Sequence, residues 1–166
     1  MRLDLREIIH VPDAHKSFQL QLDLSDLEFY GRKPIPHPVL AEGSVTNHAG
    51  ALVLEGTASS LLDLVCDRCG KEFSREKAVP LDCLLADELE DEENDEIVLL
   101  EGSEVDLDEL VTTAFVLAMD TKNLCSEDCK GLCAKCGADL NLGPCGCRPD
   151  VDPRWAALAQ LLDDES

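Results

Sequence analysis

Residues 51–85 read ALVLEGTASSLLDLVCDRCGKEFSREKAVPLDCLL and contain two long apolar segments joined by the five residues CDRCG. Both segments alternate in part between apolar and polar residues, which is the pattern of a strand with one buried face. Gly70 can adopt the left-handed backbone conformation that a tight turn needs. The stretch therefore predicts two antiparallel strands connected by a turn that carries Cys66 and Cys69.

Two segments before residue 51 show the same alternation. Residues 16–25, KSFQLQLDLS, place apolar side chains at every second position, and residues 37–47, HPVLAEGSVTN, form another partly alternating run. Residues 47–50 tolerate turn geometry, so the second run should pair with the strand that starts at residue 51. We therefore expect an antiparallel β-sheet, or a partly closed barrel, over residues 1–85.

The formal net charge of -21 is concentrated in one part of the chain. From Asp82 to Glu109 there are 14 acidic residues and no Lys or Arg. The densest part, ADELEDEENDE, repels itself and holds few apolar groups, so we expect a flexible acidic loop over residues 86–104. This loop either keeps the protein soluble or holds a basic partner.

The apolar residues change from a strand-like to a helix-like period after this loop. The segment VDLDELVTTAFVLAM predicts one amphipathic helix over residues 105–120, with acidic residues in its first turn. A second, short helix is expected near the end of the chain, where Asp152 would cap a helix that begins at Pro153. The predicted fold class is therefore α+β, with a cysteine-rich tail over residues 121–166.

Nine cysteines are present, and their spacing favours metal binding over disulfide bonds. Cys83 lies within an apolar strand segment and is expected to be a small buried side chain rather than a ligand. Eight thiolates are the number that two four-sulfur centres need. The predicted ligands are Cys66, Cys69, Cys125, Cys129, Cys133, Cys136, Cys145 and Cys147.

The spacing leaves three arrangements of these cysteines open. In the first, the last four cysteines form a local site, and the pair Cys125 and Cys129 joins the pair Cys66 and Cys69. In the second, the knuckles CDRCG and CAKCG share one metal, as paired knuckles do in zinc ribbons, and the other four cysteines bind the second metal. The third arrangement is a single metal ion with spare thiols.

The ligand set predicts two structural zinc ions. Zinc is redox-inactive and is commonly held by four thiolates in a closed tetrahedron, whereas catalytic zinc keeps an open position. The four histidines, His10, His15, His37 and His48, are not spaced like metal ligands. We therefore expect no catalytic residue and no small-molecule substrate. The alternative function is a zinc-dependent enzyme that acts on nucleic acid or on a small molecule.

Several segments occur together in this chain: VCDRCGKEF, an acidic insertion, DLDELVTTAFVLAM, CKGLCAKCGADLN and DPRWAALAQLL. In this combination the chain resembles the YceD-like family of large ribosomal RNA subunit accumulation proteins. The resemblance implies a non-enzymatic, bacterial ribosome-assembly factor that promotes accumulation of large-subunit ribosomal RNA.

The expected partner is large-subunit ribosomal RNA or a basic ribosomal protein of the large subunit. Eight Lys and Arg residues lie in or beside the cysteine motifs, but six carboxylates and the charge of two zinc tetrathiolates offset them, so neither partner is favoured. No signal peptide and no apolar run of about 18 residues is recognisable, which predicts a cytoplasmic protein without a membrane contact.

Overall fold

The computed structural model describes residues 1–86 and 97–147, which form two compact units. The first, which we call the sheet unit, consists of Met1–Val65 and Glu72–Asn123. The second, which we call the cysteine unit, consists of Cys66–Lys71 and Leu124–Ser166. The cysteine unit thus combines the turn CDRCG with the tail, while the strands on either side of that turn belong to the sheet unit. The four-part division expected from the sequence stays a prediction.

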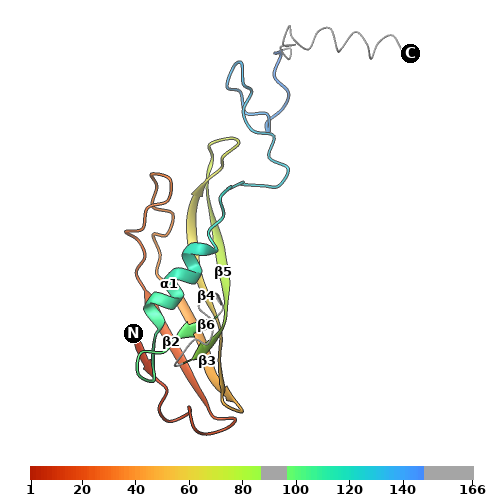
Figure 1. Cartoon of the computed structure of the whole chain (residues 1–166). Coiled ribbons are helices and arrows are strands. Elements are labelled where there is room, and N and C mark those ends of the chain that lie inside the picture. The colour runs from red at the N-terminus through yellow and green to blue at the C-terminus, as the bar shows by residue number, and fades with distance from the viewer. Residues whose placement is uncertain (87–96, 148–166) are drawn as a thin grey trace, which may run out of the picture. The chain divides into compact units, whose positions relative to one another are not determined.

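A five-stranded sheet in the order β2-β3-β4-β5-β6 forms the body of the sheet unit (Figure 1). The first four strands are antiparallel neighbours, whereas β6 pairs with β5 in parallel. The sheet is therefore open and mixed rather than a partly closed barrel. The strands are β2 (His15–Leu22), β3 (Val39–His48), β4 (Ala51–Val65), β5 (Glu72–Ala86) and β6 (Ile97–Leu99).

A two-stranded ribbon precedes the helix. It pairs β1 (Arg2–Asp4) with β7 (Glu104–Asp106) in antiparallel fashion. Strand β6 lies within the segment that was expected to be a loop. This segment is not a loop throughout, because the apolar run at residues 97–100 pairs with β5 and buries Leu100. Part of the predicted loop is therefore sheet, and its most acidic part, residues 87–96, lies outside the described residues.

The predicted hairpin between β3 and β4 is confirmed. His48 pairs with Ala51, and the two residues between them, Ala49 and Gly50, have positive φ angles of 54° and 105°. Positive φ at both central positions is the geometry of the two-residue turns that match the twist of a hairpin.

Asn47 fastens the amino-terminal segment to this hairpin. Its side chain is almost fully buried, and Nδ2 donates hydrogen bonds of 2.7 Å to the carbonyl oxygens of Ile8 and Ile9. Its Oδ1 accepts a hydrogen bond of 2.7 Å from the backbone N–H of Gly50. A buried amide with all these partners fixes both the turn and the path of residues 8–9.

Helix α1 (Leu107–Leu117) is shorter than the predicted range of 105–120. Asp106 caps it: the Asp106 side chain accepts hydrogen bonds from the backbone N–H groups of Asp108 and Glu109. The cap residue itself belongs to β7, so the helix begins directly at the end of that ribbon. None of the helices in the described part of the chain is long and apolar enough to span a membrane. The second helix predicted after Pro153 lies outside the described residues.

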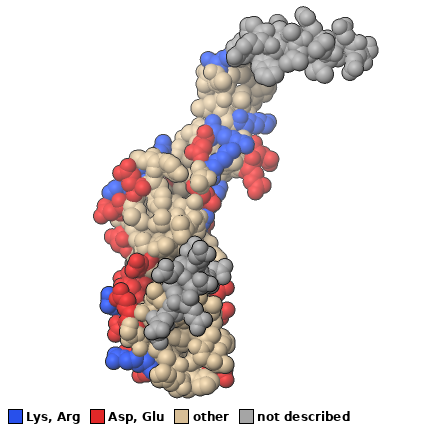
Figure 2. Space-filling model, viewed as in Figure 1, with Lys and Arg blue, Asp and Glu red and all other residues tan. Residues whose placement is uncertain are grey.

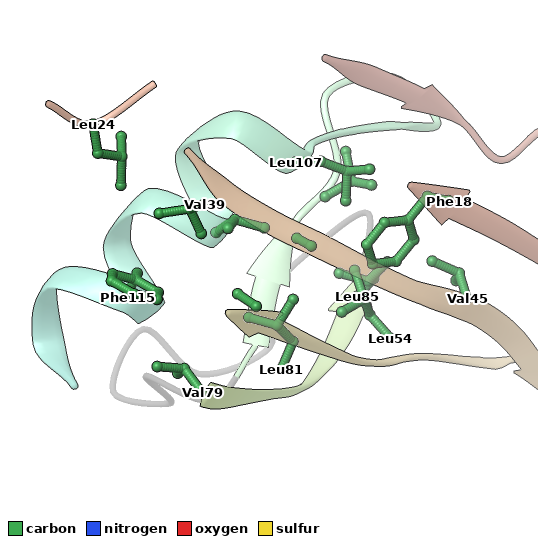
Figure 3. Close-up of a cluster of buried hydrophobic side chains, with 14 of the residues drawn as sticks. Phe18, Leu24, Val39, Val45, Leu54, Val79, Leu81, Leu85, Leu107 and Phe115 are labelled. Atoms are coloured by element: carbon green, nitrogen blue, oxygen red, sulfur yellow. The ribbon is translucent and has the colours of Figure 1, made fainter. Parts of the chain in front are cut away.

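The core of the sheet unit lies between α1 and one face of the sheet. Leu107, Val111 and Phe115 form the buried side of the helix and are fully covered. Figure 3 shows Leu107 and Phe115 in one cluster with side chains from the strands. Apolar residues alternate along β3, β4 and β5 because side chains on one face of the sheet enter this core, which also includes Leu5, Ile8, Leu24 and Ile35. The strand residues labelled in that cluster are Phe18, Val39, Val45, Leu54, Val79, Leu81 and Leu85.

Replacing Asn47 should destabilise the sheet unit. Asn47→Asp keeps the oxygen that accepts from Gly50 but removes both N–H donors, so the carbonyls of Ile8 and Ile9 lose a partner in a buried place. We expect the free energy of unfolding to fall by about 1–3 kcal/mol, measured by urea titration with far-ultraviolet circular dichroism. Gln21→Glu, on an exposed side chain of β2, is the matched control. Equal stability of both variants would contradict the assigned role.

Candidate metal centres

The eight predicted ligands fall into two groups in the described structure. Within each group the four sulfur atoms all lie within 4.8 Å of one another. The two knuckles CDRCG and CAKCG do not share a group, so the sulfur atoms follow the first of the three arrangements. The first group is Cys66, Cys69, Cys125 and Cys129, and the second is Cys133, Cys136, Cys145 and Cys147.

The first knuckle is held by its own backbone. The N–H of Gly70 donates to the carbonyl of Cys66 at 2.8 Å, and the N–H of Cys66 donates to the carbonyl of Lys71 at 2.8 Å. Gly70 has a φ of 70°, a conformation that side chains with a β-carbon adopt at a cost of about 1 kcal/mol. The turn brings Cys66 and Cys69 to the same side of the loop.

The second knuckle repeats this geometry. The N–H of Gly137 donates to the carbonyl of Cys133 at 2.8 Å, the N–H of Cys133 donates to the carbonyl of Ala138 at 2.8 Å, and Gly137 has a φ of 72°. The common sequence Cys-x-x-Cys-Gly therefore specifies one local conformation twice. The two knuckles have the same local conformation, yet each lies beside a different pair of cysteines. The local conformation therefore does not determine which cysteines complete each sulfur group.

Distances in the first group suit a four-coordinate metal ion. The Sγ atoms of Cys66 and Cys129 are 3.7 Å apart, as are those of Cys69 and Cys125. A tetrahedron with metal–sulfur bonds of about 2.3 Å has edges of about 3.8 Å, so these distances match the edges of such a site. An all-sulfur tetrahedral donor set fits zinc or iron and not magnesium or calcium, which prefer oxygen.

Backbone amides and burial give the thiols of each group different proton affinities. Hydrogen bonds from backbone N–H groups, first that of Cys125, lower the pKa of Cys66 to about 6. The backbone N–H groups of Cys136 and Lys135 likewise lower the pKa of Cys133 to about 6. One thiolate per group is thus stabilised by the protein itself.

Two other thiols have strongly raised pKa values. Burial is the largest cause that raises the pKa of Cys125 to about 12, and hydrogen bonding with neighbouring cysteines is the next largest. For Cys147, hydrogen bonding with Cys136 is the largest cause that raises the pKa to about 12, and burial is the next largest. Four thiolates packed this closely repel one another, and a divalent cation at their centre is what would remove this repulsion.

Arg68 connects the first knuckle to the tail. Its guanidinium Nη1 donates to the carbonyl of Cys129 at 2.7 Å, and its own carbonyl accepts from the N–H of Leu132 at 3.2 Å. Gly131 has a φ of 75°, and a β-carbon there would lie 3.0 Å from the carbonyl oxygen of Arg68. The tail therefore needs a glycine where it passes over Arg68.

Asn141 connects the segment after the second knuckle to the first group. Its Oδ1 accepts from the N–H of Lys130 at 2.8 Å, and its Nδ2 lies 3.5 Å from the Sγ of Cys129, to which it donates. Sequence reasoning did not single out Arg68 or Asn141 as structural residues. The available signal was their position within the motif segments CDRCG and CKGLCAKCGADLN.

Cys83 belongs to neither sulfur group and is partly rather than fully buried. Burial and the nearby charge of Asp82 raise the pKa of the Cys83 thiol to about 11, so this thiol is protonated at neutral pH. The prediction that Cys83 stands apart from the other eight therefore agrees with its position on β5.

Comparison with known proteins supports the same family as the sequence motifs. Residues 54–162 match the family model described as large ribosomal RNA subunit accumulation protein YceD. An uncharacterized protein of Mycobacterium tuberculosis is 32% identical over 119 residues, which cover 69% of this chain and 58% of that protein. The chain thus spans somewhat more than half the length of this relative.

Two plant proteins are also similar. The chloroplastic large ribosomal RNA subunit accumulation protein YCED homolog 1 of Zea mays is 24% identical over 180 residues, covering 89% of this chain and 61% of that protein. The protein of the same name in Arabidopsis thaliana is 27% identical over 158 residues, covering 76% and 49% respectively. No solved structure matches the chain.

Replacing one knuckle should release only its own partners. In Cys66→Ser with Cys69→Ser, we expect zinc content to fall from two ions per chain to one, and Cys125 and Cys129 to react with iodoacetamide, because their metal is lost. Elemental analysis of protein purified without added metal and mass-spectrometric mapping of alkylated thiols measure the two effects.

The reciprocal control is Cys133→Ser with Cys136→Ser, which should expose Cys145 and Cys147 and leave the first group protected. Alkylation of Cys133 and Cys136 in the first variant would show that the knuckles share a metal after all. A zinc content of one or less in the unmodified protein would refute the two-ion model.

Proposed function

Because the chain belongs to the YceD family of large ribosomal RNA subunit accumulation proteins, we propose that it promotes large-subunit assembly and accumulation of large-subunit ribosomal RNA without catalysing a reaction. The match over residues 54–162 carries this proposal, since it includes most of β4, all of β5 and α1, and both cysteine groups. The plant relatives are named as large ribosomal RNA subunit accumulation proteins.

In this proposal each cysteine group holds one structural zinc ion. The ligands would be Cys66, Cys69, Cys125 and Cys129 for one ion and the last four cysteines for the other. Four thiolates complete a tetrahedron and leave no open position for water or substrate. This supports a non-enzymatic role over the alternative of a zinc-dependent enzyme. None of the four histidines is part of either group.

Charge is distributed unequally between the two units. The described residues of the sheet unit include eight Lys and Arg against 18 Asp and Glu, whereas those of the cysteine unit include four of each. In Figure 2 red side chains are prominent on the visible face of the sheet unit, and blue and red ones lie close together on the cysteine unit. Phosphate is therefore repelled least by the cysteine unit.

Three exposed lysines of the cysteine unit suit a limited RNA contact: Lys71, Lys130 and Lys135. Each zinc tetrathiolate would add a formal charge of -2, so this contact would involve few phosphates. The sheet unit suits a basic ribosomal protein of the large subunit instead, and residues 87–96 add eight carboxylates to its sequence. We place this work in the bacterial cytoplasm; the plant relatives are named chloroplastic.

Depleting the protein in its host should lower mature large-subunit ribosomal RNA relative to small-subunit RNA, because assembly of the large subunit would be impaired. The ratio is measured by quantitative northern blotting, and precursors are followed by sedimentation. Re-expressed wild-type protein should restore the ratio, whereas the variant Cys66→Ser with Cys69→Ser should not. Gln21→Glu, at an exposed position of β2, is the control and should restore it fully. An unchanged ratio after depletion would refute the assembly role.

A further inference from the structure

A groove of about 670 Å³ lies on the sheet unit between α1 and the strands β5 and β6. Its floor consists of partly buried side chains that pack against the core: Cys83, Val98, Leu110 and Ala114. The volume falls in the range of about 300–1,000 Å³ typical of binding sites for small ligands and side chains. None of these residues takes part in the cysteine groups.

Exposed leucines border the groove. Leu117 is 80% exposed, Leu99 is 49% exposed and Leu84 is 42% exposed, and all three line this one groove. Single exposed leucines are ordinary on protein surfaces, but several around one hollow mark an interaction site. They come from three different elements, α1, β6 and β5, so the arrangement depends on the fold and not on one apolar segment.

Carboxylates also line the groove. They are Asp82, Glu101, Asp106 and Glu109. Arg2 lies 2.9 Å from Glu101 and 3.7 Å from Asp106, and the amino terminus of Met1 also lies 3.7 Å from Asp106. Among the ion pairs of residues 1–86 and 97–147, none includes Asp82 or Glu109. The groove therefore combines an apolar surface with an excess of negative charge.

We propose that this groove binds a segment of a basic protein in which apolar side chains adjoin a cluster of Lys and Arg. Apolar side chains of the segment would cover the exposed leucines, and its cations would meet the carboxylates. The inference deepens the proposed function, on which it rests for the identity of the partner as a basic protein of the large subunit. What it adds is the site and the sequence pattern that the site would select.

Charge argues against the other occupants. Residues 87–96 contain eight acidic residues and no basic one, and residues 148–166 contain five acidic and two basic residues. A second copy of the chain carries a net charge of -21. Each of these would bring negative charge to a groove that is already negative, as would the phosphates of RNA.

The order of groups along α1 sets the pattern of the ligand. Asp106 and Glu109 lie at the start of the helix, and Leu117 lies at its end. At 1.5 Å per residue, Glu109 and Leu117 are about 12 Å apart along the axis. A segment that contacts both the carboxylates and Leu117 must carry its cations on one side of its apolar residues. A sequence with separate blocks of Lys and Leu should therefore bind better than one in which Lys and Leu are interspersed.

The test uses full-length, zinc-loaded protein and three dye-labelled peptides of 14 residues, followed by fluorescence anisotropy. The first peptide has a block of Lys followed by a block of Leu and Ala, the second has the same residues interspersed, and the third has Glu in place of Lys. We expect the blocked peptide to bind most tightly and to weaken as salt rises from low to high ionic strength. The Glu peptide should not bind.

Two groove variants and two matched controls locate the site. Asp82→Asn with Glu109→Gln removes two charges, and Leu117→Ser removes an exposed apolar side chain; each should raise the Kd of the blocked peptide about fivefold or more. Glu28→Gln with Glu76→Gln, and Leu40→Ser, make the same changes at exposed positions of the sheet unit outside the groove. These controls should change the Kd by less than about twofold.

Three outcomes would overturn the inference. One is equal loss of affinity in groove variants and controls. Another is loss of affinity only when the acids between Asp87 and Glu96 are replaced by Ser and Asn. The third is occupancy by the chain itself, seen as a dimer that Leu117→Ser dissociates, or as tighter peptide binding after removal of residues 148–166.

The result is independent of the depletion experiment. If depletion lowers the large-subunit RNA but the groove variants bind the peptide like wild type, only the groove inference fails. If the peptide binds through the groove but depletion leaves the RNA ratio unchanged, only the assembly role fails.

Discussion

The turn CDRCG is the constraint on which both units depend. It closes the hairpin of β4 and β5, and it provides Cys66 and Cys69, whose sulfur partners are 63 and 56 residues further along the chain. Joining such distant residues costs loop-closure entropy that grows only slowly with length, so one strong metal site would offset it. The same five residues therefore serve the sheet as a turn and the tail as an anchor.

The path of the tail is fixed by contacts with this turn. Arg68, the central residue of the turn, holds the carbonyl of Cys129 through its side chain and the N–H of Leu132 through its backbone. Asn141 then returns the chain from the second knuckle to Lys130 and Cys129. These contacts give the second cysteine group a defined connection to the first, and they explain why Gly131 and Asn141 lie where they do in the motif CKGLCAKCGADLN.

Periodicity predicted the strands and the helix that are long enough to show it. β2, β3, β4 and β5 each have eight or more residues, and their apolar residues alternate because one face of the sheet contributes side chains to the buried core. β1, β6 and β7 have three residues each, which is too short for a recognisable pattern, and β6 follows an acidic stretch that suggested loop. The role of Asn47 was missed for another reason: its partners are the carbonyls of Ile8 and Ile9, some 39 residues away.

The cysteine groups show where spacing alone stops being informative. Because CDRCG and CAKCG form the same local turn, the sequence left open whether they bind one metal together or two metals separately. The answer depends on how residues 124–147 fold back, which is set by Arg68, Gly131 and Asn141 rather than by the cysteines. The sequence therefore singled out the eight cysteines that form the two sulfur groups, but it left their grouping open, and metal binding by them stays a prediction.

Charge constrains how a protein of this composition could promote the accumulation of RNA. An acidic chain gains little from counterion release, so broad contact with phosphates would not hold it on RNA. Under the proposed function, the cysteine unit would contact few phosphates, and the acidic sheet unit would bind a cationic ribosomal protein that is later transferred to the RNA. Ribosomal RNA has a higher charge density than the sheet unit and would compete for the same Lys and Arg residues. A partner held in this way would be shielded from unspecific contacts until RNA displaces the acidic surface. This exchange requires that the acidic surface bind the partner weakly enough to release it.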